Sequence, residues 1–472
     1  MSNLKRNIAY NFIYQVLILL LPLITAPYLA RVIGASGVGS YSYSYTMATY
    51  FTYFVKLGLD NYGNRAIASV QSDRAERSRR FCSIYALQIS CFFIASVAYA
   101  IYIAVFSRDK TLAAIQAIYL ISSLFDINWF FFGMEKFSMT VVRNTLIKIA
   151  TTVSIFIFVK DGNDVWAYTV IMCVGFLASQ LALWPFVPKF VDFVKPHCSD
   201  VLQHLKPNAV LFVSVIAISV YNMMSRLMLG AMSGMEQVGY FENAAKLISV
   251  PTALINAVGT VMLPRTSYLL SNDGKDSALR YMDNTMRGVM SFSFLALFGL
   301  TAISDNFVMW FYGPGYEDTA AVLRVLAATV PILGFGNVIR TQYLIPSGKD
   351  KVFLMSAVCG AITSIVVNTL LIPMYGCVGS AMASVAAETA VLVCQVVGVG
   401  KSISVGRYIG IVLRYSICGL IMFLLLEYTN MIREGFIGLL STVVIGLAIY
   451  GAAVVVGLIA ARAVRRIKEK VD

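Results

Sequence analysis

Apolar runs of about 20 residues recur along the whole chain and are separated by short polar or charged connections. A helix needs roughly 20 apolar residues to cross the hydrocarbon core of a bilayer. The sequence is 58% hydrophobic and only 13% charged, whereas soluble domains carry about 25% charged residues. These runs exclude a soluble globule and predict an all-α integral membrane protein with about 14 transmembrane helices.

Lysine and arginine are distributed unequally between alternate connections. Most of the 37 basic residues lie near the termini and in every second connection, and basic loops face the cytoplasm. The opposite side holds Arg31, Arg108, Lys110, Lys160 and Arg433. We therefore expect both termini to be cytoplasmic. The net charge of +13 follows from this bias and from contact with anionic membrane lipids, so that no nucleic acid is expected as a partner.

The two halves of the chain share short motifs in the same order. Arg31–Gly34 and Val38–Tyr41 correspond to Arg226–Gly230 and Val238–Tyr240. The offset contains six predicted helices, an even number, so both copies run in the same direction through the membrane. We predict two six-helix lobes related by this internal repeat, followed by two extra helices. The boundaries are 1–195 for the N-terminal lobe, 196–400 for the C-terminal lobe, and 401–472 for the extra helices and a basic cytoplasmic tail.

Polar side chains follow the helical period along two corresponding predicted helices. The first stripe consists of Ser42, Thr46, Thr49, Tyr53, Lys56 and Asp60, and the second contains Glu242, Lys246, Ser249 and Asn256. Polar residues also join helices in dry bundles, so a buried structural stripe is the alternative. Because two matched helices carry a stripe, we expect both to line a water-filled cavity.

Ionised side chains interrupt several of the predicted helices. About ten of them facing lipid would cost on the order of 25–35 kcal/mol, more than the stability of a typical fold, about 5–15 kcal/mol. Most must therefore face a hydrated interior, where cations outnumber acids. A phosphate or diphosphate fits such a cavity because arginine and lysine match its oxygens. The predicted substrate-binding cations are Arg31, Arg143, Lys148, Arg226, Lys246 and Arg340.

Three acids within the predicted helices are candidates for coupling transport to H⁺ or Na⁺: Asp126, Glu242 and Glu388. For Glu242, which lies one turn from a lysine, a plain structural pair is the alternative. Pro22 and Pro27 each remove a backbone hydrogen bond from the first predicted helix. They suit either a hinge or a static kink.

Cysteine and histidine indicate no metal site and no cofactor. Most of the 8 cysteines lie in apolar runs without ligand spacing, where thiols act as small hydrophobic groups. His197 and His204 lie in a polar segment between Pro196 and Pro207. We expect both histidines in an exposed loop.

Four segments carry a family resemblance. They are FVKLGLDNYGNRAIA (54–68), WFFFGMEKF (129–137), RNTLIK (143–148) and NTLLIPMYGCVGSA (368–381). Together they resemble the polysaccharide repeat-unit flippases (Wzx type) of the bacterial multidrug/oligosaccharidyl-lipid/polysaccharide exporter superfamily. The chain departs from this pattern at Ser225, where the resemblance leads us to expect an acid.

The resemblance implies two six-helix lobes around a central cavity in the bacterial inner membrane. It also implies transfer of an oligosaccharide linked to undecaprenyl pyrophosphate from the inner to the outer leaflet, for capsule, O-antigen or exopolysaccharide synthesis. The polyprenyl tail stays in the membrane lipids, and alternating access of a cationic cavity lets the head cross. A polysaccharide polymerase and a chain-length regulator are the implied protein partners.

Two transporter functions of the same fold are alternatives: a multidrug or toxin exporter, and a flippase for the peptidoglycan lipid precursor. Exporters of cationic compounds need an acid-dominated cavity, whereas cations dominate here. A membrane glycosyltransferase or polysaccharide polymerase is the alternative from another class. Such enzymes need a sizeable external loop, and the predicted external connections are short. We therefore predict a transporter and not an enzyme.

Overall fold

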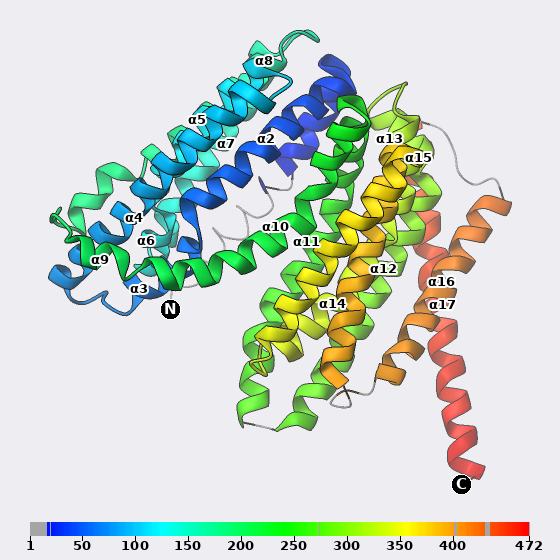
Figure 1. Cartoon of the computed structure of the whole chain (residues 1–472). Coiled ribbons are helices and arrows are strands. Elements are labelled where there is room, and N and C mark those ends of the chain that lie inside the picture. Colours follow the sequence, from blue (N-terminus) through cyan, green and yellow to red (C-terminus); the bar gives the residue numbers. More distant parts are fainter. Residues whose placement is uncertain are drawn as a thin grey trace. The chain divides into compact units, whose positions relative to one another are not determined.

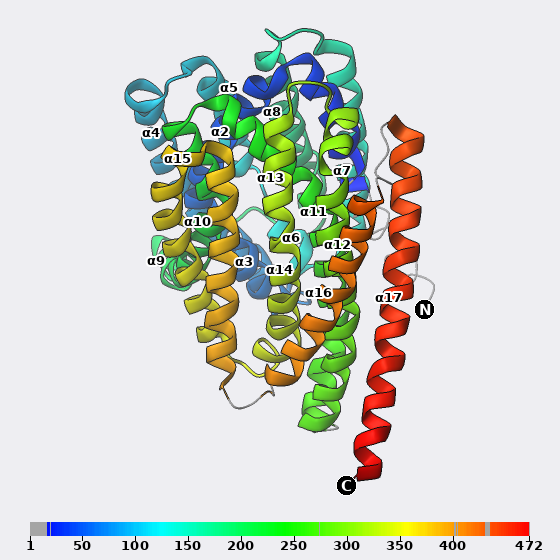
Figure 2. The same cartoon turned by 90° about the vertical axis from the view of Figure 1, so that its right-hand side faces the viewer.

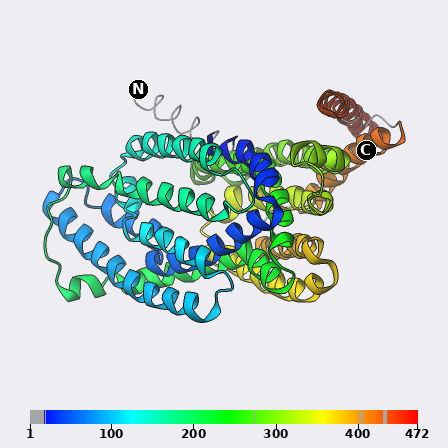
Figure 3. The same ribbon diagram turned by 90° about the horizontal axis from the view of Figure 1, so that it is seen from above.

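In the computed structural model, every regular element is a helix among the described residues, which are 17–18, 20–272, 274–400, 403, 405–429 and 435–471. Figures 1, 2 and 3 show the helices from three directions. Side chains beyond residue 459, including those of the predicted basic tail, lie outside the described part.

The helices begin and end as follows. The first ten are Leu20–Val32, α2 (Gly34–Lys56), α3 (Leu59–Ala68), α4 (Arg74–Ile101), α5 (Lys110–Leu124), α6 (Asn128–Gly133), α7 (Phe137–Phe158), α8 (Val165–Leu181), α9 (Cys198–Leu202) and α10 (Leu205–Met232). They are followed by α11 (Met235–Asn272), α12 (Lys275–Phe311), α13 (Glu317–Ala327), α14 (Thr329–Ile339), α15 (Asp350–Val399), α16 (Val405–Tyr428) and α17 (Gly435–Val471). Short π or 3₁₀ turns occupy Tyr102–Phe106, Trp184–Lys189 and Arg340–Leu344.

The number of long apolar helices agrees with the sequence prediction. Ten described helices are long and apolar enough to cross a membrane. One of them, α15, joins two helices at Gly376, whose φ of 53° and ψ of −128° are not helical. Also, α2 and α7 have 23 and 22 residues, the length of a span, and Leu20–Val32 is a shorter apolar helix. With these added, the described residues contain about 14 helical segments, in agreement with the predicted number.

The chain divides into two compact units, Met1–Gly239 (unit 1) and Tyr240–Asp472 (unit 2). Helix α10 packs against α2 and α3, which places it in unit 1. The division into lobes at residues 195 and 196, and their relation by a repeat, stay predictions.

Each unit has its own core. In unit 1, the aromatic rings of Phe81, Trp129, Phe130 and Phe131 are fully buried between α3, α4, α6 and the segment after α8. In unit 2, α16 and α17 lie side by side against α12. The Tyr450 hydroxyl there donates a hydrogen bond of 2.7 Å to the carbonyl of Ser291. The aromatic core of unit 1 is the scaffold of the site described next.

Candidate functional site

A helix break after Lys56 positions the first two members of the site. Helix α2 ends at Lys56. The next residue, Leu57, has a φ of 48°, a backbone conformation that residues other than glycine rarely adopt. Gly58 follows, and a new helix, α3, begins at Leu59. This break leaves Asp60 in the first turn of α3, within reach of the lysine four residues before it.

A second helix break positions Asp126, between the end of α5 and the start of α6. The last carbonyls of a helix have no partner within it. Here the fully buried amide of Gln88 donates to the carbonyls of Ser123 (2.7 Å), Leu124 (3.3 Å) and Asp126 (3.0 Å). The indole N–H of Trp129 in turn donates to the Gln88 side-chain oxygen at 3.2 Å. The break is thereby held in one conformation.

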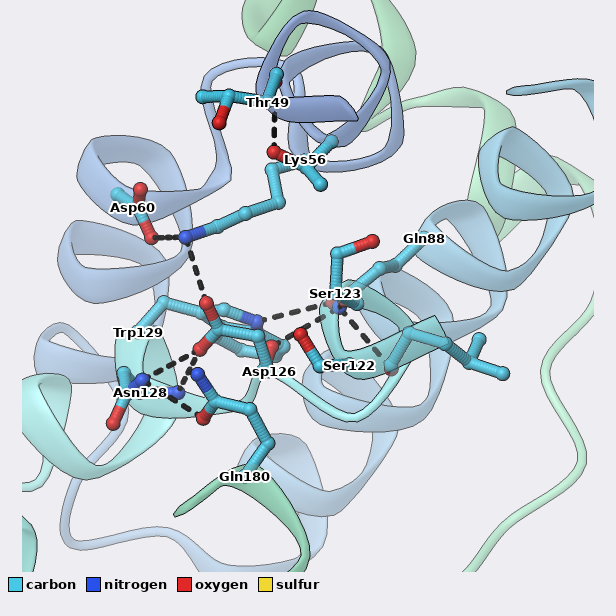
Figure 4. Close-up of polar contacts among 12 residues, drawn as sticks. Thr49, Lys56, Asp60, Gln88, Ser122, Ser123, Asp126, Asn128, Trp129 and Gln180 are labelled. Atoms are coloured by element: carbon cyan, nitrogen blue, oxygen red, sulfur yellow. Dashed lines mark hydrogen bonds and ion pairs between the residues drawn. The ribbon is translucent and has the colours of Figure 1, made fainter. Parts of the chain in front are cut away.

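The two breaks bring three charged groups together. The Lys56 ammonium lies 2.8 Å from a carboxylate oxygen of Asp126 and 2.8 Å from one of Asp60 (Figure 4). The two acids differ in environment, because the Asp126 side chain is 9% exposed and that of Asp60 is 63% exposed. The cluster is therefore a buried ion pair with a second, solvent-facing carboxylate.

Polar contacts extend from Asp126 to an arginine of α7. One Asp126 oxygen accepts hydrogen bonds from the backbone (3.1 Å) and side-chain (2.7 Å) nitrogens of Asn128. The Asn128 amide also donates to Gln180 at 3.1 Å, and its oxygen accepts from Arg143 at 3.2 Å (Figure 4 shows the first of these). We call Lys56, Asp60, Asp126, Asn128 and Arg143 the Lys56 network.

Close packing of α3 on α6 places the first two family segments side by side. A Cβ atom on Gly63 would lie 2.6 Å from Cε3 of Trp129, and one on Gly133 would lie 2.9 Å from the carbonyl of Asn64. Only glycine permits this approach. The third family segment begins at Arg143, which belongs to the Lys56 network. The first family segment therefore meets the second and third, which are distant from it in sequence, in one place.

The other predicted residues of unit 1 occupy several environments. The hydroxyls of Thr46 and Thr49 are buried and donate to carbonyls of their own helix, each at 2.7 Å. Ser42 is also buried, whereas Tyr53 is half-buried. Arg31 is exposed, and Lys148 is half-buried on α7. The half-buried Arg226 guanidinium donates to the Asn222 carbonyl at 3.1 Å. Pro22 and Pro27 lie within the continuous helix Leu20–Val32.

The remaining predicted residues belong to unit 2. Glu242, Lys246, Ser249 and Asn256 follow one another along α11. The side-chain oxygen of Asn256 accepts a hydrogen bond of 2.8 Å from Asn337. The Arg340 guanidinium lies 5.7 Å from the centre of the Phe353 ring, and Glu388 is half-buried on α15. Their roles in binding and coupling stay predictions.

Sequence reasoning missed the neutral members of the site. The sequence analysis selected residues by the free-energy cost of placing an ionised group in lipid. It did not select three uncharged residues of the site, Gln88, Asn128 and Gln180. The signal available was an amide within an apolar run, as at Gln88. The expectation of an exposed loop was wrong for His204, which is only 4% exposed because α3 and α4 pack around it. Among the described residues, no cluster of His, Cys, Asp or Glu could hold a metal ion.

The Lys56 network can hold charge inside the protein and also respond to it. An ammonium group has three N–H donors, and in the described part of the chain Lys56 uses them for Asp126 and Asp60 only. Removing either partner of a buried pair such as Lys56 and Asp126 strongly destabilises the fold. An exposed carboxylate such as Asp60 readily exchanges its contact with the lysine for contacts with water. Ionisable groups held within a membrane protein are typical of transport pathways.

Fold and site together define a multi-span helical membrane protein of the transporter class. A family model for polysaccharide biosynthesis proteins (Polysacc_synt) matches residues 4–270. The chain therefore belongs to this family, which confirms the resemblance seen in the sequence.

Relatives and solved structures agree with this assignment. A protein of Escherichia coli (strain K12) named "Putative O-antigen transporter" is 24% identical over 396 residues, covering 82% of this chain and 94% of the relative. "Probable low-salt glycan biosynthesis flippase Agl15" of Haloferax volcanii is 21% identical over 252 residues, covering 53% of each chain. These names are those of transporters and flippases, in agreement with the prediction that the chain is not an enzyme.

Two solved structures show the same fold. The lipid II flippase MurJ in an inward closed conformation superposes with a TM-score of 0.75 at 17% identity, over 95% of this chain and 98% of that one. An inward-facing MATE multidrug transporter of the MOP superfamily gives 0.56 at 13% identity, over 82% of this chain and 95% of that one. The predicted exporter-type fold is confirmed.

Proposed function

We propose that this protein flips an oligosaccharide linked to undecaprenyl pyrophosphate from the inner to the outer leaflet of the bacterial inner membrane, for surface polysaccharide synthesis. Family membership over residues 4–270 supports the pathway, and the long apolar helices support the membrane location. The observation that carries the proposal is the convergence of three family segments on a charged network inside unit 1.

The physical problem is to move a diphosphate past hydrocarbon. The polyprenyl tail can remain in lipid, so the protein has to shelter only the charged, sugar-bearing head. Arginine and lysine bind phosphate oxygens through charge-assisted hydrogen bonds. In the proposal, Arg31, Arg143, Lys148, Arg226, Lys246 and Arg340 bind the head while the lobes alternate between inward and outward access, with Pro22 and Pro27 as the hinge.

The Lys56 network is the proposed coupling element. Asp126 holds Lys56, and Asp60 is the accessible partner of the same ammonium. Protonation of Asp126 would release Lys56 from the buried partner and shift it toward Asp60. In this way an H⁺ changes the charge presented by unit 1, with Glu242 and Glu388 as further candidates for H⁺ or Na⁺.

Complementation of a bacterial strain that lacks its O-antigen flippase tests the function. The wild-type chain is expected to restore surface polysaccharide, and the double variant Arg226→Ala/Lys246→Ala is expected to lose this activity while still inserting in the membrane. Lys189→Ala removes a cation outside the predicted site and is the matched control. Full complementation by the double variant would eliminate the proposed head-binding residues.

The fold of MurJ favours a second candidate function, transfer of the peptidoglycan lipid precursor. Expression in a strain depleted of its own peptidoglycan-precursor flippase separates the two functions. Rescue of growth there, without rescue of surface polysaccharide, would favour the second.

A further inference from the structure

A second polar cluster in unit 1 shares no residue with the Lys56 network. Helices α3 and α4 and the junction between α9 and α10 enclose a cavity of about 360 Å³. Its polar lining includes Tyr62, Glu76, Arg79, Arg80, Gln203 and His204. None of these was singled out as a functional residue from the sequence.

The histidine on the cavity wall contacts a hydroxyl group at each ring nitrogen. The Ser83 hydroxyl donates to the Arg80 carbonyl at 3.1 Å, so the same oxygen accepts from Nε2 of His204 at 2.9 Å. Nδ1 of His204 then accepts from the Tyr62 hydroxyl at 2.6 Å. In this tautomer both ring nitrogens of the buried imidazole have a partner. The charge that faces the cavity therefore comes from α4.

Two adjacent arginines of α4 line the cavity, and each has a guanidinium nitrogen that its contacts within the described residues do not use. Arg79 binds Asp200 through Nε (3.1 Å) and Nη2 (3.0 Å). Arg80 binds Glu76 through Nε at 2.8 Å, and its Nη1 donates to the Ala66 carbonyl and the Ser69 hydroxyl. A guanidinium has five N–H donors. Within the described part of the chain, Nη1 of Arg79 and Nη2 of Arg80 donate to no acceptor.

The position of the cavity relative to the apolar part of α4 indicates the kind of ligand. The polar first turns of α4 end at Arg80, and the apolar run of this candidate span begins at Phe81. The cavity thus lies at the polar end of a membrane helix, the level at which lipid head groups lie. Glu76 in the lining binds Arg80, and Asp200 outside the lining binds Arg79, so both carboxylates already have a partner and the remaining N–H groups of the two arginines are available to a ligand.

We propose that this cavity binds the phosphate of an anionic phospholipid head group. Guanidinium groups match phosphate oxygens in geometry and charge, and the amide of Gln203 adds a neutral hydrogen-bonding group on the same wall. The bound lipid would hold α3, α4 and the start of α10 together. Because the site is distinct from the proposed head-binding cations, the proposal stands independently of the transported substrate.

Native mass spectrometry of the full-length protein, released from detergent and titrated with phosphatidylglycerol, tests the site. Arg79→Gln/Arg80→Gln is expected to bind the lipid about tenfold more weakly, the effect of losing about 1.4 kcal/mol. Arg74→Gln is the matched control, because Arg74 binds Asp192 through the same two nitrogens but does not line the cavity. Its lipid binding is expected to equal that of the wild type.

A second variant separates the cavity from its charge. Ala66→Phe fills the cavity and leaves both arginines in place, and it is expected to weaken phosphatidylglycerol binding as well. If the double arginine variant does not fold, Ala66→Phe decides the question. Unchanged binding by Ala66→Phe, or by a folded double arginine variant, would overturn the proposal. Displacement of the lipid by an equal concentration of inorganic phosphate would also overturn it, in favour of a soluble phosphate ligand.

Discussion

The two carboxylates around Lys56 should differ sharply in their contribution to stability. In Asp126→Asn, a lysine that is 19% exposed loses a partner that is 9% exposed. Removing one member of a buried pair typically lowers the free energy of unfolding by about 3–5 kcal/mol. In Asp60→Asn, the lost partner is 63% exposed, and such pairs contribute about 0–1 kcal/mol.

Thermal unfolding of the full-length protein in detergent measures this difference. For a unit of this size, Tm falls by about 2–4 °C per kcal/mol. Asp126→Asn should therefore lower Tm by roughly 6–20 °C and Asp60→Asn by at most about 4 °C. The double variant Lys56→Met/Asp126→Asn should recover part of the loss, because, among the described residues, the only charge that it leaves without its partner is that of Asp60, which is exposed to solvent. Equal effects of Asp126→Asn and Asp60→Asn on Tm would refute the reasoning. So would a Lys56→Met/Asp126→Asn variant whose loss of Tm equals the sum of the losses in Lys56→Met and Asp126→Asn.

Three further predictions concern the packing and titration of unit 1. Gly63→Ala should lower the free energy of unfolding by about 1–3 kcal/mol, because the added methyl group overlaps a buried indole ring. The control is Gly288→Ala, because Gly288 has open space around it. Equal melting temperatures of the two variants would contradict the close packing at Gly63. Gln88→Leu leaves carbonyls at the α5 break without a donor and should cost about 1–3 kcal/mol for each unsatisfied group; hydrogen exchange should rise at this break and not elsewhere. The hydrogen bond from Arg74 holds the pKa of Asp192 below its ordinary value of 3.8, so the pair stabilises the fold above about pH 4 and its effect is lost as the pH falls through the lowered pKa. Tm values of the wild type and Asp192→Asn should differ at about pH 6 and converge as the pH falls through the lowered pKa of Asp192. A difference that stays constant as the pH falls would contradict this.

The fold class followed from the sequence because hydropathy and helix length are local properties. Runs such as 81–106 and 164–187 are apolar over the length of a span, and the structure has helices there. The break at Gly376 lies between two apolar runs of the sequence, 352–373 and 377–400. The packing of α10 against α2 was not visible, because contacts between distant segments leave no periodic signal in one sequence.

The candidate site was predicted in its charges but not in its pairing. Asp126 and Arg143 were selected because ionised groups are costly in a membrane, and Lys56 because it lies on a polar stripe. That Lys56 binds Asp126, far along the chain, depends on two helix breaks that local sequence rules do not place. Within the stripe, Thr46 and Thr49 are buried with their hydroxyls bonded to their own helix. The water-filled cavity along the stripe stays a prediction.

The most direct test of the account is a flipping measurement with purified protein in vesicles. Vesicles would carry a fluorescent oligosaccharide linked to a polyprenyl diphosphate, and a membrane-impermeant quencher would report the fraction of label in the outer leaflet over time. We predict that the wild-type protein accelerates exchange of this lipid but not of fluorescent phosphatidylcholine, and that Arg226→Ala/Lys246→Ala abolishes the acceleration. Exchange no faster than in protein-free vesicles, or equally fast with the double variant, would contradict the account.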